Sequence, residues 1–111
     1  MCKTQVLSSK KHTAITHCPG CNVYYVWHNN LVLSFSQQDF SNFRKIIEHA
    51  AFGDTSLPFP DQKDRILLRT PNDDISFAFT RKELESFKGL LNEAVYMNEV
   101  YTLMRTEPGT R

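Results

Sequence analysis

The sequence lacks a long hydrophobic run, an excess of charge of one sign, and clustered glycines. No apolar stretch approaches the roughly 18 residues that a membrane-spanning helix needs, so we expect no membrane partner. The formal net charge of the 111 residues is +1, and nucleic acid is therefore not the expected partner. The four glycines are scattered, which excludes a glycine-rich phosphate-binding loop.

Cysteine is also scarce, and the amino-terminal segment has no apolar core. The residues MCKTQVLSSKKH do not match a secretory signal peptide, so we expect a cytoplasmic protein. Three cysteines are an odd number, and thiols stay reduced in that compartment, which argues against a disulfide framework. Hydrophobic residues make up 41% and charged residues 23%, as in ordinary globular proteins, and the length predicts a single domain over residues 1–111.

Two segments of the chain, residues 31–50 and 75–94, match each other without a gap. Each has the alternating apolar residues of a strand, followed by an apolar stripe at helical spacing. A strand candidate and a turn precede each segment; the two candidates are residues 22–28 and 65–70. The pattern predicts an α+β fold of duplicated ββα units, about residues 22–52 and 65–104, that form an antiparallel sheet with both helices packed on one face. The segment before residue 19 predicts one further hairpin.

Both predicted helices begin with a sequence typical of a capped N-terminus. Thr80 and Glu83 form a capping box, and Ser36 and Asp39 form an acidic variant of it. Gly53 is well placed to end the first helix. We expect corresponding core residues of the two copies to be buried in equivalent environments: Phe35, Phe40, Phe43 and Ile47 with Phe79, Leu84, Phe87 and Leu91.

The second helix has no stop signal before Pro108, and we expect it to continue to about Met104. Its apolar face extends beyond the length of the first helix through Met97, Val100, Tyr101 and Met104. An exposed apolar patch of this kind tends to find a partner. The sequence therefore predicts a homo-oligomer that forms through the C-terminal helix, most simply with twofold symmetry.

The segment CPGC, from Cys18 to Cys21, has the spacing of a zinc knuckle. A structural zinc normally has four ligands, and the chain has no second Cys-x-x-Cys. The remaining ligands would come from Cys2, His12, His17 or His28, or from another subunit. Cys2 and His12 are preferred, because His17 stands directly beside Cys18 and neighbours in sequence rarely bind one ion together. Two other interpretations stay open: a redox dithiol, and a turn that holds no ligand.

Three aromatic residues, Tyr24, Tyr25 and Trp27, lie in one predicted strand. Aromatic side chains on a sheet surface stack on bases in some RNA-binding proteins, and strand propensity explains them equally well. Alternation places Tyr25 and Trp27 on one face of the strand and Tyr24 on the other. The adjacent Lys10 and Lys11 are most simply solvated surface. A nucleic-acid-binding knuckle is therefore the third alternative.

These segments resemble a family of small bacterial proteins of unknown function. The resemblance rests on CPGC, YYVWHNNLVLSFS and FSNFRKII, which cover roughly the middle third of the chain. It implies a small cytosolic protein and no established activity, so it assigns no catalytic residue. We expect a non-enzymatic interaction or assembly module. The alternative is a protein in which Cys18 and Cys21 bind zinc or act as thiols.

Overall fold

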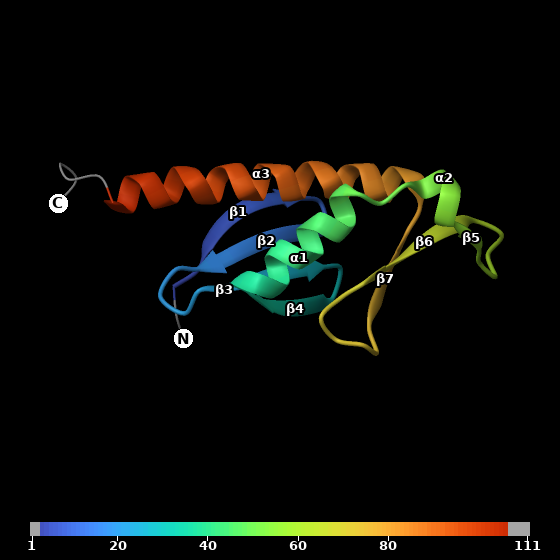
Figure 1. The fold of residues 1–111 in the computed structure, drawn as a ribbon, viewed down its shortest axis with the longest axis horizontal. Helices are drawn as coiled ribbons and strands as arrows, with labels where there is room; N and C mark the ends of the chain where they lie inside the picture. The colour runs from blue at the N-terminus through green and yellow to red at the C-terminus, as the bar shows by residue number, and fades with distance from the viewer. Residues whose placement is uncertain (1–2, 107–111) are drawn as a thin grey trace. The chain divides into compact units, whose positions relative to one another are not determined.

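The computed structural model describes residues 3–106, which form two compact units (Figure 1). The first unit contains the described residues up to Ser36 and from Leu90 onward, and the second contains Gln37–Gly89. The α+β class is confirmed. The elements are β1 (Gln5–Lys10), β2 (Thr13–Cys18), β3 (Val23–His28), β4 (Leu31–Ser36), α1 (Gln37–Glu48), α2 (Phe52–Thr55), β5 (Leu57–Pro58), β6 (Asp64–Arg69), β7 (Ser76–Phe79) and α3 (Arg81–Thr106).

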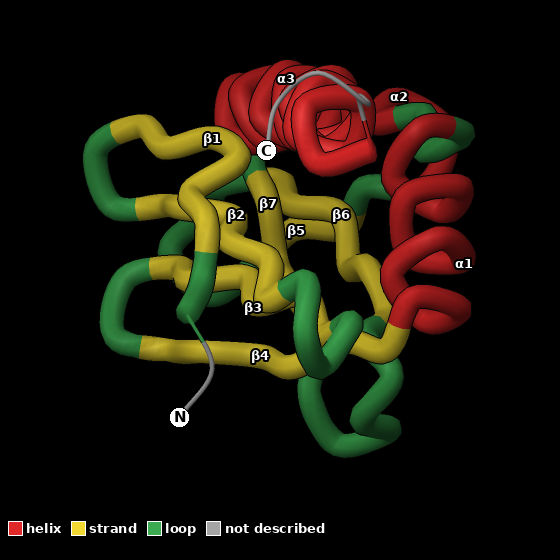
Figure 2. Tube along the Cα trace, turned by 90° about the vertical axis from the view of Figure 1, so that its left-hand side faces the viewer, coloured by secondary structure: helices red, strands yellow, loops and turns green. Residues whose placement is uncertain are grey.

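The first unit is built on an antiparallel sheet in the order β1-β2-β3-β4, with the strands side by side in Figure 2. The hairpin expected before residue 19 is confirmed as β1 and β2. The register aligns Ile15 with Val26, and Val26 with Leu33. All three are buried, and they define what we call the inner face of the sheet.

Helix α3 supplies its second part, from Leu90 onward, to the first unit, where it contacts the strands. The Oγ of Ser8 donates a hydrogen bond to the carbonyl oxygen of Leu90, 2.9 Å away. The Nδ2 of Asn98 donates to the Oη of Tyr24 at 3.0 Å. Because Ser8 is buried, its bond to Leu90 satisfies a polar group that would be costly to leave unpaired. No helix among the described residues is long and apolar enough to span a membrane.

The second unit contains α1, α2, the antiparallel strands β5-β6-β7 and the first turns of α3. Its core is a cluster of phenylalanine rings. The rings of Phe43 and Phe87 meet nearly edge-on, with centroids 6.0 Å apart, and the rings of Phe77 and Phe79 stack at 5.3 Å. Aromatic pairs of this kind contribute about 0.5–1.5 kcal/mol beyond the burial of their area.

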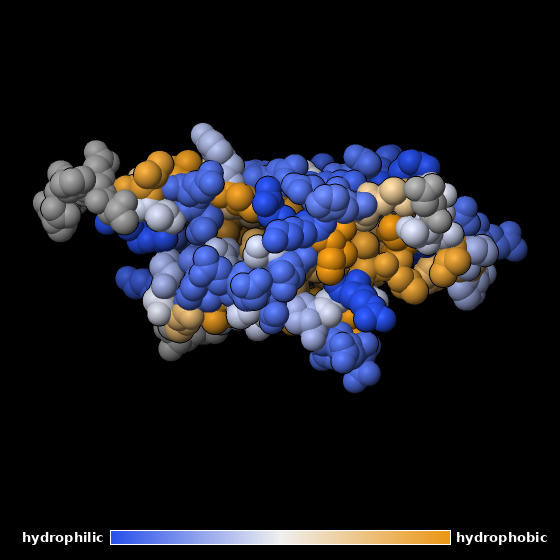
Figure 3. Space-filling model, viewed as in Figure 1, coloured by the Kyte–Doolittle hydropathy of each residue, from blue (hydrophilic) through white to orange (hydrophobic). Residues whose placement is uncertain are grey.

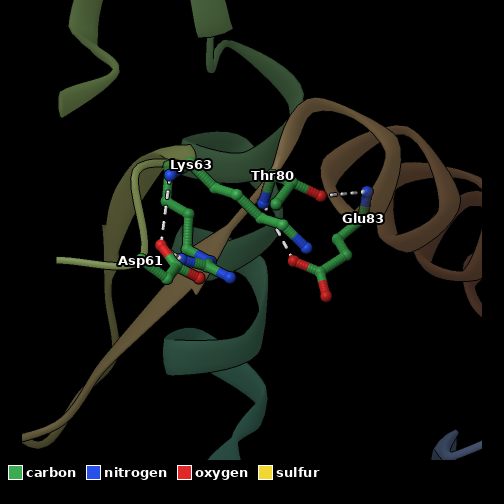
Figure 4. Close-up of polar contacts among 5 residues, drawn as sticks. Asp61, Lys63, Thr80 and Glu83 are labelled. Atoms are coloured by element: carbon green, nitrogen blue, oxygen red, sulfur yellow. Dashed lines mark hydrogen bonds and ion pairs between the residues drawn. The ribbon is translucent and has the colours of Figure 1, made fainter. Parts of the chain in front are cut away.

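The capping box at the start of α3 is confirmed (Figure 4). The backbone N–H of Thr80 donates to Oε1 of Glu83 at 2.9 Å, and the N–H of Glu83 donates to Oγ1 of Thr80 at 3.3 Å. The same figure shows Asp61 accepting from the backbone N–H of Lys63 at 3.1 Å. That hydrogen bond is the main cause of a lowered pKa at Asp61, with the nearby Arg65 guanidinium acting in the same direction.

The expected core is buried, since all eight predicted residues are at most 5% exposed. Equivalent environments are not confirmed for every pair, because Phe35 belongs to the first unit and its counterpart Phe79 to the second. Phe43 and Phe87 contact each other, and both rings also contact Phe77.

Two details of the predicted fold are wrong. The first helix ends at Glu48, where the N–H of Ala50 donates to the carbonyl of Ile47 at 3.2 Å, and Gly53 lies within the short helix α2. The strands also form two sheets, of four and three strands, in place of one. The order strand–turn–strand–helix does occur twice, as β3-β4-α1 and β6-β7-α3. A duplicated ββα unit is not confirmed, because β3 and β4 belong to the first unit and α1 to the second.

Candidate functional site

The two cysteines of the CPGC segment stand at the end of β2 and in the turn that follows. The N–H of Asn22 donates to the carbonyl of Cys18 at 2.7 Å, and Asn22 has a φ of 56°, which asparagine tolerates well. Cys18 is a free thiol and is only 1% exposed. Cys21 is exposed and is disulfide-bonded, which corrects the expectation that the cysteines stay reduced. Its sulfur is a possible metal ligand only after reduction.

The structure does not bring His12 to these cysteines. His12 lies in the turn between β1 and β2, and the full length of β2 separates it from Cys18. Six residues of strand span roughly 20 Å. Cys2 lies outside the described residues. Among residues 3–106, no group of three His, Cys, Asp or Glu side chains is arranged to hold a metal ion. Zinc binding at Cys18 and Cys21 thus stays a prediction.

His17 is buried on the inner face, where its ring stacks on that of Tyr24 with centroids 4.2 Å apart. Its Nε2 lies 3.2 Å from Oδ1 of Asn22, and its Nδ1 is buried without a hydrogen-bond partner. Burial lowers the pKa of His17, and the positive charge of Arg105 acts in the same direction. Burial also raises the pKa of the Tyr24 hydroxyl. His17 is therefore a neutral core residue at pH 7.

The outer face of the four-stranded sheet carries exposed apolar and aromatic side chains. Trp27 aligns with Ala14 on one side and Val32 on the other, so these residues share the outer face. The exposed fraction is 45% for Trp27 and 43% for Val32. Nε1 of Trp27 donates to Oγ1 of Thr16 at 3.1 Å, which holds the indole ring over the sheet. Tyr25, also on this face, is half-buried, so Trp27 is the more exposed of the two aromatic residues that alternation places together.

A surface hollow of about 400 Å³ lies at the end of this face, beside the β1–β2 turn. Trp27 and Thr16 line it from the sheet, and Lys11 and His12 line it from the turn. The hollow thus combines the aromatic ring of Trp27 with the ammonium group of Lys11 and the imidazole of His12, and no carboxylate is among its lining residues.

A family model matches residues 1–107 of the chain. The chain belongs to the DUF6686 family. This is a family of unknown function, as the resemblance of the sequence had implied. No curated protein and no solved structure matches the chain significantly.

From the sequence of this DUF6686 protein, Trp27, Lys11 and His12 were each noted, but their meeting in one hollow was missed, because charge was judged only in total. All twelve carboxylates of the chain come after residue 36, and none lies in residues 3–36. That segment holds Lys3, Lys10, Lys11 and three of the four histidines. A charge count made segment by segment would have marked the sheet as cationic.

Proposed function

We propose that this DUF6686 protein is a non-enzymatic association module that forms a homodimer through α3. The observation that carries the proposal is an exposed apolar face on the second part of this helix. The exposed fractions are 64% for Tyr96, 69% for Leu103 and 55% for Met104. Figure 3 shows apolar surface near the C-terminal end of α3. Large apolar side chains that are exposed together commonly mark an interaction site.

The position of this face follows from the contacts on the opposite side of the helix. Ala94 is fully buried and Asn98 bonds to Tyr24, so these residues mark the side that packs on the sheet. Tyr96 and Leu103 are seven residues apart, which is about two turns, and therefore lie together on the other side.

The patch expected from the sequence is shifted by this packing. Of its four residues only Met104 is exposed, and Met97, Val100 and Tyr101 are half-buried. Met97 and Tyr101 flank the buried side that Ala94 and Asn98 define, which explains their partial burial.

The spacing of Tyr96 and Leu103 favours a second copy of the chain as the partner that covers this face. In an antiparallel pair with its twofold axis between Glu99 and Val100, Tyr96 lies against Leu103 of the partner subunit, and the reverse contact forms as well. A twofold interface must be self-complementary in this way. Two paired helices bury less than the roughly 1,200–2,000 Å² of a standard stable complex, so we expect a reversible dimer.

The test is light scattering on variants in which one exposed leucine becomes an acid. Leu103→Glu places a charge at the centre of the proposed contact and should leave a monomer at concentrations where the wild type is dimeric. Leu67→Glu is the matched control, because Leu67 is also about half exposed, at 51%, but lies on β6. Dissociation by Leu67→Glu, or a Leu103→Glu protein that remains dimeric, would contradict the proposed interface.

Zinc or thiol chemistry at Cys18 and Cys21 is the alternative function. The observation in its favour is the tight turn that holds both cysteines, closed by the bond from Asn22 to Cys18. It further requires reduction of Cys21, exposure of the buried Cys18 and ligands from elsewhere. Association requires no such change, and we therefore prefer it.

A further inference from the structure

The hollow beside the β1–β2 turn holds the two kinds of group that recognise a nucleotide. A nucleotide has a flat base, which stacks on aromatic rings, and a phosphate, which attracts cations. Trp27 supplies the ring, and Lys11 and His12 supply donors for the phosphate. All three line the same hollow of about 400 Å³.

Trp27 is held in position for stacking. Its Nε1–H is already bonded to Thr16, so the edge of the indole is fixed against the sheet while the residue stays 45% exposed. A ring that is fixed before the ligand arrives loses little freedom on binding. Tyr25, two residues away on the same face, could continue the aromatic surface for a second base.

Lys11 has a backbone conformation that lysine seldom adopts. Its φ is 50°, in the left-handed region that glycine and asparagine adopt more readily. The neighbouring turn uses Asn29 at a φ of 56°, and the N–H of Asn29 donates to the carbonyl of His12 at 2.8 Å. The two turns are thus tied together, and one of them keeps a lysine at a strained position beside the hollow.

The electrostatic setting favours an anion. The four strands and their turns contain no Asp or Glu, since all twelve carboxylates of the chain follow residue 36. Lys10 precedes Lys11 and is also exposed. A phosphate at the turn therefore meets cations and hydroxyl groups, with no carboxylate from this sheet to repel it.

We propose that the hollow binds a nucleotide, either free or as part of a single strand of RNA or DNA. The base stacks on Trp27, and the phosphate is held by Lys11 and His12. This site is separate from the exposed face of α3 and does not depend on dimer formation. The proposal involves binding alone and no chemical step.

Trp27 is the only tryptophan of the chain, so its fluorescence reports directly on the hollow. The full chain is titrated with AMP, with UMP and with short single-stranded oligouridine and oligothymidine. We expect saturable quenching. Equal affinity for a mononucleotide and a strand identifies a free nucleotide as ligand, and a clear preference for the strand identifies single-stranded nucleic acid. Absence of quenching by every one of these probes overturns the proposal, as does equally tight binding of inorganic phosphate or of a nucleoside alone.

The decisive variant is Lys11→Asn, because asparagine suits the positive φ and the fold should be retained or slightly stabilised. Its binding to the strand should weaken, and the slope of log affinity against log salt should fall by about 1. Lys45→Asn, an exposed lysine on α1, is the matched control and should change neither. Trp27→Leu, followed with a fluorescently labelled strand, should lose roughly tenfold or more in affinity. Unchanged binding by Lys11→Asn, or an equal loss in Lys45→Asn, overturns the proposal.

Discussion

At the scale of single residues, the buried His17 couples the stability of the first unit to pH. Burial lowers the pKa of its ring below the ordinary value of 6.5, so the unfolded chain takes up a proton more readily than the folded chain. At a pH above the pKa of this histidine in the unfolded chain, the group has no effect on stability. As the pH falls below that pKa, the unfolded chain is protonated first and stability is lost.

The expected result is a melting temperature that falls as the pH is lowered from about 7 to about 5. His17→Gln should reduce this dependence, because glutamine takes up no proton. Equal pH dependence in the wild type and in His17→Gln would show that His17 does not couple folding to pH.

The cysteines give a second prediction at this scale. We expect reduced protein, purified without a metal-affinity tag, to contain far less than one zinc per chain, because Cys18 is buried and the structure places His12 at the other end of β2. Elemental analysis measures this ratio. A ratio near one zinc per chain would restore the zinc interpretation, and a ratio near one half would indicate a site shared between two chains.

For single residues, the sequence predicted side-chain positions that depend on residues adjacent in the chain. The poor position of His17 beside Cys18 was recognised, and the strand indeed turns the two side chains to opposite faces. The distance between His12 and the cysteines was not foreseen, because it depends on which strand pairs with which.

At the scale of single elements, the capping box should stabilise α3 measurably. Thr80→Ala removes the oxygen that accepts from the N–H of Glu83 and should cost about 1 kcal/mol of the free energy of unfolding. Ser41→Ala, at an exposed position of α1, should change stability by less than about 0.5 kcal/mol. Urea denaturation compares the two. A Thr80→Ala protein as stable as the control would mean that the cap contributes nothing in solution.

The phenylalanine cluster gives a prediction about coupling. Phe43→Ala and Phe87→Ala should each cost about 3–5 kcal/mol, as is usual for buried aromatic residues. Because the two rings contact each other, the double variant should cost less than the two single variants added together. Chemical denaturation of the three variants measures the difference. Strict additivity would show that the rings do not interact.

The elements themselves were largely predictable. Hairpins, the capping box and the length of α3 depend on residues close in sequence, and these predictions agree with the structure. The end of α1 at Glu48 and the division of the strands into two sheets depend on packing between distant segments. A match between residues 31–50 and 75–94 shows that the segments are alike, and it does not show that they pack alike.

At the scale of the whole molecule, charge and apolar surface are distributed unevenly along the chain. The net charge of the chain is near zero, although the four-stranded sheet contains no carboxylate. The apolar face of α3 lies on the side of the helix opposite its contacts with the sheet. Total composition predicted an ordinary globular protein and could not reveal either feature. The expectation of a partner at the C-terminal helix came from helical periodicity. That periodicity predicted the helix correctly, but of the residues expected to be exposed only Met104 is so.

Sedimentation equilibrium of the wild-type chain over a range of concentrations tests association most directly. We predict an apparent mass that rises from the 12.9 kDa of one chain toward twice that value as the concentration increases. A mass that stays at 12.9 kDa at every concentration would contradict the proposal that this protein assembles through α3.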